Sequence, residues 1–346
     1  MRPTADPTMP PPPESQRDTV HSIRRRSRLP RLAYGFPVVA VALGVGLFLR
    51  NHHTNKPTLH AGAGATAAGA PNGAHPRLFL DPATLATLKT QSADATKGAA
   101  LAKTKCNVAY ATPKQVEWGF GWGYAASSCA LAYQLTNDAT YATKGIFFLN
   151  ALLDDFHVIG DGLGGDDVVT HDTGYYMRVY APYAALSYDW LHDAPGMTES
   201  LRAKMRGRFA AWLGWYDTKG YLRHRAGANY QAGYLFAATL IAIAEGGEAG
   251  TAGEAAWTNV VGTLFDVDMI GQTKPGGALD GGDWAEGWQY GPLSVVEYSL
   301  ATRALAEQGH HYPLLDKYQS DLVRRYLHGS SPATHGLWIG GDTSHG

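Results

Sequence analysis

The stretch Arg225-Ala-Gly-Ala-Asn-Tyr-Gln-Ala-Gly-Tyr234 places polar side chains at the start of a helix that is almost wholly apolar from Leu235 to Ala244. A second stretch, Asp280-Gly-Gly-Asp-Trp-Ala-Glu-Gly-Trp-Gln-Tyr290, gathers carboxylates, tryptophans and a tyrosine just before another helical segment. The N-terminus of a buried helix has unpaired N–H groups and the positive end of the helix dipole, which favour an anionic ligand. We therefore expect the two stretches to form one functional site.

From Pro82 onward the apolar residues recur with a helical period, and we find no convincing set of alternating strands. Asp81 can act as the N-cap of a first helix that Pro82 opens. The sequence therefore predicts an all-α fold. The segments expected to be helical are 82–91, 94–111, 120–136, 138–154, 174–192, 198–217, 229–245, 253–270, 287–308 and 312–327.

Four of these segments end in similar sequences, which indicates an internal repeat. The equivalent positions are Tyr133, Tyr188, Ile243 and Leu305, at steps of 55, 55 and 62 residues. A period of this size fits a pair of antiparallel helices repeated around an axis, either as an open solenoid or as a closed (α/α) barrel. The long loops rich in Gly and Asp at 159–174 and 271–287 favour the closed form, an (α/α) toroid.

Composition narrows the class of protein. The chain has 346 residues, 45% of them hydrophobic, and a formal net charge of −1. A near-neutral balance argues against nucleic acid as a partner, because phosphate binding needs a basic surface. The two cysteines, Cys106 and Cys129, lack metal-binding spacing, so we expect no metal site and no cofactor. A buried free thiol and a structural disulfide are both compatible with these cysteines.

The first seventy-four residues differ in composition from the rest of the chain and are not expected to fold with it. Residues 1–31 are rich in proline and arginine and are expected to be a disordered cytoplasmic tail. Residues 32–49 carry no charge and are long enough for a transmembrane signal anchor. The arginines before this segment predict a cytoplasmic N-terminus. We expect 50–74 to be a flexible linker and 75–346 to be an extracytoplasmic domain of the cell envelope, or a secreted one if the segment is a cleaved signal peptide.

The polar residues of the two stretches suit one reaction. The Asn229 amide can bind a carboxylate, and the Tyr290 phenol can take or give a proton. Cleavage of a uronic-acid glycan by β-elimination needs the carboxylate neutralised, a base for the C5 proton and an acid for the leaving oxygen. Arg223, His224 and Arg225 could lower the pKa of the tyrosine or bind substrate carboxylates.

Four motifs in order along the chain carry a resemblance. They are His75-Pro-Arg-Leu-Phe79, Leu186-Ser-Tyr-Asp-Trp-Leu191, Asn229-Tyr-Gln-Ala-Gly-Tyr234 and Gly282-Asp-Trp-Ala-Glu-Gly-Trp-Gln-Tyr290. Together they resemble the (α/α) toroid domain of heparinase II/III-like and related alginate lyases, over 75–346. The resemblance implies a polysaccharide lyase in which Asn229 neutralises the uronate and Tyr290 is base and acid.

This chain also departs from the family pattern in two respects. Some relatives have a histidine where this chain has Tyr230, and the family continues into a β-sandwich that adds another histidine to the cleft. The end of the chain, 341–346, resembles the junction between toroid and sandwich, so we expect either a truncated sequence or a lone toroid. We expect His171 to be the third catalytic residue. The expected substrate-binding residues are Tyr230, Gln231, Arg225, Trp284, Glu286 and Trp288.

Other interpretations of the same residues stay open. Asn229 could simply cap its helix, and Tyr290 could be a core aromatic residue. Asp283 and Glu286 could be the paired carboxylates of a glycoside hydrolase, or a solvated capping box. A non-catalytic envelope protein that binds glycans would keep the cleft without the reaction. The expected partners are an acidic polysaccharide substrate and, through 32–49, the membrane.

Overall fold

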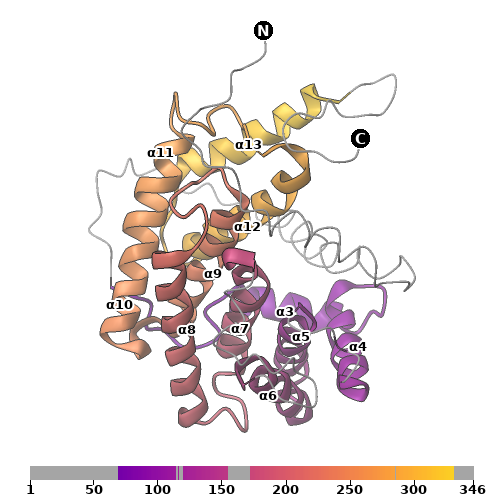
Figure 1. Ribbon diagram of the computed structural model, residues 1–346. Coiled ribbons are helices and arrows are strands. Elements are labelled where there is room, and N and C mark those ends of the chain that lie inside the picture. Colours follow the sequence, from indigo (N-terminus) through magenta and orange to yellow (C-terminus); the bar gives the residue numbers. More distant parts are fainter. Residues whose placement is uncertain (1–68, 114–115, 117–119, 155–171, 285, 331–346) are drawn as a thin grey trace, which may run out of the picture. The chain divides into compact units, whose positions relative to one another are not determined.

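The computed structural model describes residues 69–113, 116, 120–154, 172–284 and 286–330, and all regular elements in this part are helical (Figure 1). This confirms the predicted all-α class. The α-helices are α3 (Pro82–Gln91), α4 (Gly98–Ala111), α5 (Phe120–Thr136), α6 (Ala139–Asp154), α7 (Met177–Leu191), α8 (Glu199–Lys219), α9 (Asn229–Glu245), α10 (Thr251–Thr258), α11 (Ile270–Thr273), α12 (Gly287–Glu307) and α13 (Pro313–His328).

Helix boundaries follow the sequence pattern closely. The predicted segments 82–91, 120–136 and 229–245 coincide with α3, α5 and α9. Asp81 caps α3 as predicted, since its side chain accepts hydrogen bonds from the N–H groups of Ala83 and Thr84. The largest departure is 253–270, which is not one α-helix. There α10 leads into the π-helix η4 (Asn259–Met269) and then α11, after the 3-10 turn η3 (Gly246–Ala249).

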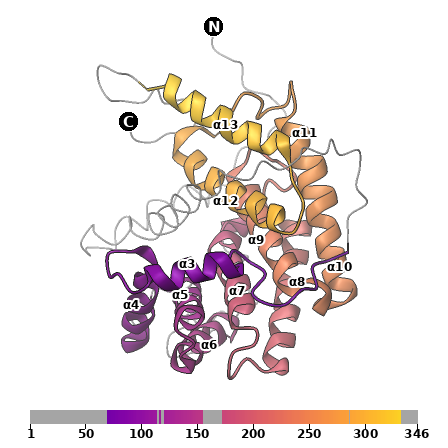
Figure 2. The same cartoon turned by 180° about the vertical axis from the view of Figure 1, so that it is seen from behind.

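Alternate helices are neighbours. Helix α5 contacts α7, α7 contacts α9, and α9 contacts α12 (Figures 1 and 2). The helices between them pack outside this row: α6 on α5 and α7, α8 on α7 and α9, and α10 on α9. Nearly every residue of α7 and α9 is buried, whereas α8 buries one face. A helix that is apolar all round needs this inner position.

The predicted repeat coincides with these inner helices. Its four equivalent positions, Tyr133, Tyr188, Ile243 and Leu305, lie near the C-terminal ends of α5, α7, α9 and α12. Consecutive repeats are therefore neighbours in space. The repeated sequence marks the inner helix of each pair. The C-terminal end of each inner helix packs against the C-terminal end of the next inner helix, so similar residues are needed there.

A disulfide joins Cys106 of α4 to Cys129 of α5. Both residues are fully buried. Of the two interpretations left open by the sequence, the disulfide is the one observed, and the free thiol is not.

A segment ahead of α3, residues 70–80, is bound to the helices, and we call it the strap. The Ala70 N–H donates to Glu254 Oε2 at 3.0 Å, and the Gly247 N–H donates to the Pro71 carbonyl at 2.9 Å. The buried Asp189 carboxylate accepts from the backbone N–H groups of Arg77 and Leu78. Residues 70–74, which the sequence assigned to the linker, are therefore packed on the helices as well.

No helix within the described ranges is both long and apolar enough to cross a membrane. The predicted tail 1–31 and the predicted transmembrane segment 32–49 lie outside those ranges.

Candidate functional site

Asn229 is the first residue of α9, and its side chain does not cap that helix. The N-cap is Ala228, which makes no side-chain cap hydrogen bond. The interpretation of Asn229 as a plain helix cap is therefore wrong. The side chain is buried and turns to two other segments: its Nδ2 donates to Glu286 Oε2 at 3.0 Å, and its Oδ1 lies 3.4 Å from Arg178 Nη1.

Glu286 places a carboxylate at the N-terminus of α9. Besides the side-chain bond, the Asn229 backbone N–H donates to the same Oε2 atom at 2.7 Å. An amide and a helix N-terminus thus hold one carboxylate oxygen together, at the position where an anion is electrostatically favoured. In this structure the anion comes from the protein itself.

A buried ion pair supports the Asn229 backbone. Arg178 of α7 donates to Glu297 of α12 through Nε at 2.8 Å and through Nη2 at 2.6 Å, and Nη2 also reaches the Asn229 carbonyl at 2.6 Å. Burial alone would lower the pKa of Arg178, but the Glu297 carboxylate outweighs this and raises it. Arg178 therefore remains charged. Neither residue of this pair was predicted from the sequence as part of the site.

Tyr290 lies in the first turns of α12, four residues after Glu286, and is half-buried. Glu297 follows it by seven residues, which puts the two on one face of the helix. Because Glu297 contacts Arg178, this face of α12 turns toward α7 and the start of α9. The two predicted catalytic residues thus belong to neighbouring helices whose N-terminal ends meet at Glu286. The spacing from Tyr290 to Glu297 was the signal that could have identified Glu297.

Tyr230 belongs to an aromatic cluster beside Asn229. Its ring makes edge contacts with Tyr175 and Tyr221 at centroid distances of 5.3 and 5.1 Å, and its hydroxyl donates to Asp172 Oδ1 at 3.1 Å. Burial raises the pKa of Tyr230, and the negative charge of Asp172 raises it further. Tyr230 therefore stays protonated, which suits a binding surface better than a base.

The predicted loop of basic residues lines an open pocket of about 460 Å³. The basic residues that line the pocket are Lys219, Arg223, His224 and Arg225. The other lining residues are Thr173, Gly220, Tyr221 and Leu222. Leu222 and His224 have left-handed backbone angles, φ 53° and 60°, which cost free energy for residues with a Cβ. Lys219 and Arg225 are exposed, and neither has an ion-pair partner within the described ranges.

Gln231 supports the backbone of this basic loop. It is fully buried, and its Oε1 accepts from the His224 backbone N–H at 3.1 Å. Gln231 was predicted to bind substrate directly, but its buried position suits support of the basic loop instead.

The acidic loop does not bring its two carboxylates together. Glu286 contacts α9, whereas Asp283 Oδ1 pairs with Arg325 of α13 at 2.7 Å. Glu286 is the N-cap residue of α12 but makes no side-chain cap bond, so the capping-box interpretation is wrong. Trp284 is 8% exposed and packs against Tyr298, which indicates a core position. His171 and the Trp288 side chain lie outside the described residues.

Comparison of the chain with protein-family models gave no match, and comparison with curated proteins gave no match either. The resemblance to heparinase II/III-like and alginate lyases therefore rests on the four sequence motifs alone.

Proposed function

We propose that this chain is the (α/α) toroid domain of a polysaccharide lyase that cleaves a uronic-acid glycan by β-elimination. One observation carries the proposal: the Asn229 amide and the N-terminus of α9 jointly hold a carboxylate oxygen, that of Glu286. A uronate carboxylate can accept the same two hydrogen bonds, so it can replace the Glu286 carboxylate at this position. The tyrosine that the reaction needs is on the adjoining turn of α12.

The closed arrangement is part of this proposal. Alternation of inner and outer helices, with a repeat step of one helix pair, supports an array that curves around an axis. In such an array the N-terminal ends of successive inner helices gather at one mouth. The beginnings of α9 and α12, which carry Asn229 and Tyr290, would meet at that mouth.

The proposed reaction assigns one task to each residue. Asn229 and the helix N-terminus stabilise the negative charge that develops on the uronate carboxylate. Tyr290 as phenolate takes the C5 proton, and the electron pair left on C5 forms the C4–C5 double bond as the C4–oxygen bond breaks. The leaving oxygen then takes the proton from Tyr290. The Arg178 guanidinium supplies positive charge beside Asn229 throughout.

The basic pocket supports an acidic polymer as the substrate. Lys219 and Arg225 are exposed cations one loop ahead of Asn229, where neighbouring uronates of a chain would lie. The Cys106–Cys129 disulfide supports the proposed extracytoplasmic location, because disulfides persist in oxidising compartments. Anchoring through residues 32–49 remains part of the proposal.

A lyase assay tests this function. The protein is incubated with alginate, heparan sulfate, chondroitin sulfate and hyaluronan, and the ultraviolet absorbance of an unsaturated uronate is followed. Absorbance should rise on at least one glycan and stay flat on its carboxyl-reduced form, because the reduced polymer has no carboxylate for Asn229. Saturated products would indicate a hydrolase instead.

A glycan-binding protein without catalysis is the second candidate. The exposed Lys219 and Arg225 of the basic pocket favour it, since they can bind an acidic glycan while Glu286 keeps the Asn229 amide occupied. Tight, salt-sensitive binding of the glycan with no product of either kind would support this candidate over the lyase.

A further inference from the structure

A second polar cluster lies at the opposite end of α9 from Asn229. It joins His75 of the strap, His192 at the C-terminal end of α7 and Glu248 of η3, which follows α9. Because α9 has 17 residues, the two clusters lie on the order of 25 Å apart along this helix. The reaction proposed above does not use this second cluster.

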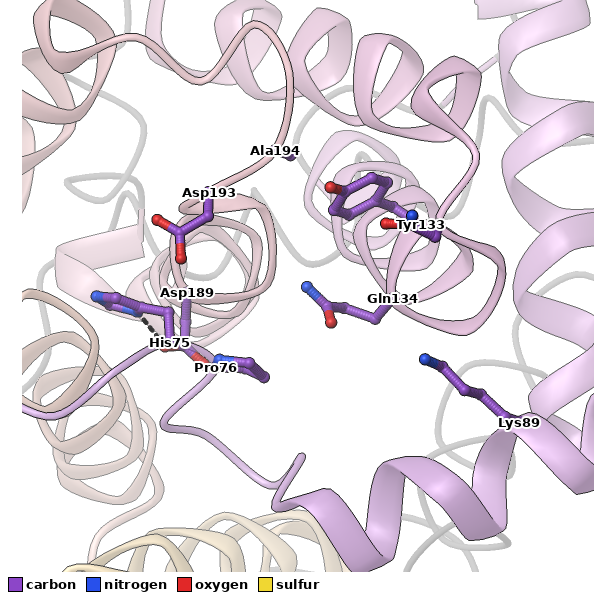
Figure 3. A pocket seen from close by; sticks show the side chains of 9 residues that line it. His75, Pro76, Lys89, Tyr133, Gln134, Asp189, Asp193 and Ala194 are labelled. Carbon is purple, nitrogen blue, oxygen red and sulfur yellow. Dashed lines mark hydrogen bonds and ion pairs between the residues drawn. The ribbon is translucent and has the colours of Figure 1, made fainter.

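Each histidine of the cluster has a carboxylate on the nitrogen that faces away from Glu248. His75 Nδ1 lies 2.6 Å from Asp189 Oδ1, and His192 Nδ1 lies 2.6 Å from Asp193 Oδ1. Figure 3 shows His75 joined to Asp189, with Asp193 beside them, at the edge of a pocket of about 290 Å³. Metal-binding histidines usually donate their outer N–H to a carboxylate, because this contact fixes the tautomer and raises the basicity of the inner nitrogen.

The inner nitrogens both face one carboxylate. His75 Nε2 lies 2.6 Å from Glu248 Oε1, and His192 Nε2 lies 2.9 Å from Glu248 Oε2. When Nδ1 of each ring donates its proton to an aspartate, Nε2 carries a lone pair. Lone pairs at these distances from carboxylate oxygens repel one another unless a positive charge lies between them. That charge is either a proton on each ring or one shared cation.

We propose that His75, His192 and Glu248 bind a divalent cation of the zinc class. Two imidazole nitrogens and one carboxylate oxygen are a common zinc ligand set that leaves a fourth position open. The three ligand atoms lie within 4.8 Å of one another. Ligand atoms around zinc lie about 3.3 Å apart for bonds of about 2.0–2.1 Å. The Glu248 carboxylate therefore needs to withdraw from the two imidazole nitrogens by less than about an ångström, and a pair of ligand atoms as far apart as 4.8 Å must approach by about 1.5 Å.

Binding requires two further local adjustments. The two imidazole rings are stacked, with centroids 3.7 Å apart and planes at 9°, so one ring must tilt before both lone pairs point at one ion. His192 can tilt because it follows the last residue of α7 and is partly exposed. Arg77, whose Nη2 lies 2.9 Å from Glu248 Oε1, must turn away from that oxygen, against the bonds that its Nη1 makes to the carbonyls of Ile243 and Ala244.

The consequence of the proposed site is structural. Its ligands come from the strap and from the ends of two inner helices, so one ion would fasten the start of the packed chain to the helix array. Ligands that bind only the folded state stabilise it in proportion to the logarithm of their concentration. Zinc should therefore raise the melting temperature by about 5 °C or more at a hundredfold excess over Kd.

The test uses the full chain, stripped with a chelator and titrated with Zn²⁺ and then with Co²⁺. We expect one site per chain by calorimetry and a strong visible absorption from tetrahedral Co²⁺. His192→Gln should weaken zinc binding at least about 100-fold, and Asp193→Asn, a change at an exposed side chain, should weaken it about 10–100-fold. The controls are His311→Gln and a His52→Gln, His53→Gln, His60→Gln triple variant, which should retain the site.

Three results would overturn the proposal. They are absence of zinc binding by the wild type, zinc binding that Asp193→Asn and His192→Gln leave unchanged, and loss of the zinc signal in the triple variant. The first would make the cluster a metal-free ion-pair network in which protons supply the charge. Because the readouts are binding, melting and Co²⁺ spectra, they do not depend on lyase activity.

Discussion

Glu286 and Asn229 form a contact that a uronate substrate would have to replace. Glu286→Gln removes the negative charge that competes for the Asn229 donors, so we expect tighter binding of a uronate oligosaccharide, by several-fold. The same change weakens the charged contact with the N-terminus of α9, and we expect a loss of about 1 kcal/mol of stability. Calorimetric titration and urea unfolding measure the two effects.

Asp283→Asn is the matched control for this prediction. It removes the same charge from the same loop, but Asp283 pairs with Arg325 of α13 and not with α9. Affinity should stay at the wild-type value in this control. Weaker binding by Glu286→Gln would instead indicate that Glu286 contacts the substrate directly.

Glu245, the last residue of α9, is a buried carboxyl group whose Oε2 has no hydrogen-bond partner in the described part of the chain. Burial raises its pKa to about 7, although the positive charge of Arg206 opposes the shift. The folded state therefore binds this proton more tightly than the unfolded state. This contribution to stability is complete below about pH 4.5 and is lost as the pH rises through 7.

Glu245→Gln should therefore make the protein more stable at pH 8, by an amount on the order of 3 kcal/mol, and change it little at pH 4.5. Urea unfolding at both pH values, with a chelator present, measures this difference. Glu199→Gln is the control: hydrogen bonds from Arg206 and Arg202 lower the pKa of Glu199, so it should not gain stability at pH 8. An equal gain for Glu245→Gln at both pH values would contradict the assignment.

The disulfide joins two helices near the start of the packed chain. It closes a loop with a sequence separation of 23 residues. A loop of this length stabilises a fold by about 3 kcal/mol, chiefly by restricting the unfolded chain. Cys106→Ala with Cys129→Ala should lower the free energy of unfolding by that amount, and a reducing agent should lower the melting temperature of the wild type alone. Unfolding curves that coincide for wild type and variant would contradict this.

Helices could be predicted from the sequence because each has a strong local signal. The boundaries of α9 follow from its apolar run, and the start of α3 follows from Asp81 and Pro82. The π-helix at 259–269 could not be predicted, because its apolar spacing still resembles an α-helix. The repeat was readable because the same end of each inner helix packs in the same way.

The candidate site was only partly predictable. Asn229 and Tyr290 stand in recognisable motifs, and the structure puts them on adjoining helices. The residues that fix the site do not stand in such motifs. The spacing from Tyr290 places Glu297 on the same face of α12, but no local spacing pairs Glu297 with Arg178 of α7, 119 residues away. Glu286 was assigned to the substrate, whereas the structure has its carboxylate against Asn229. Such contacts depend on how helices pack, which local sequence does not encode.

Across the whole chain, the strap is the segment that ties the beginning of the packed region to distant helices. A chain that starts at residue 81 lacks the strap donors, so the buried Asp189 carboxylate loses its three partners. An unpaired buried charge costs about 3–5 kcal/mol. We expect this fragment to melt well below a chain that starts at residue 69, the matched control. Equal melting temperatures, followed by circular dichroism, would show that the strap contributes nothing.

The central claim is that Tyr290 moves the proton in a β-elimination at Asn229. The most direct measurement is the initial rate of unsaturated-uronate absorbance for wild type, Tyr290→Phe and Tyr110→Phe, a control on α4. We predict a rise for wild type and Tyr110→Phe, and at least a hundredfold lower rate for Tyr290→Phe, with glycan affinity retained. An undiminished rate in Tyr290→Phe, or no unsaturated product from folded wild type on any uronate glycan, would contradict the claim.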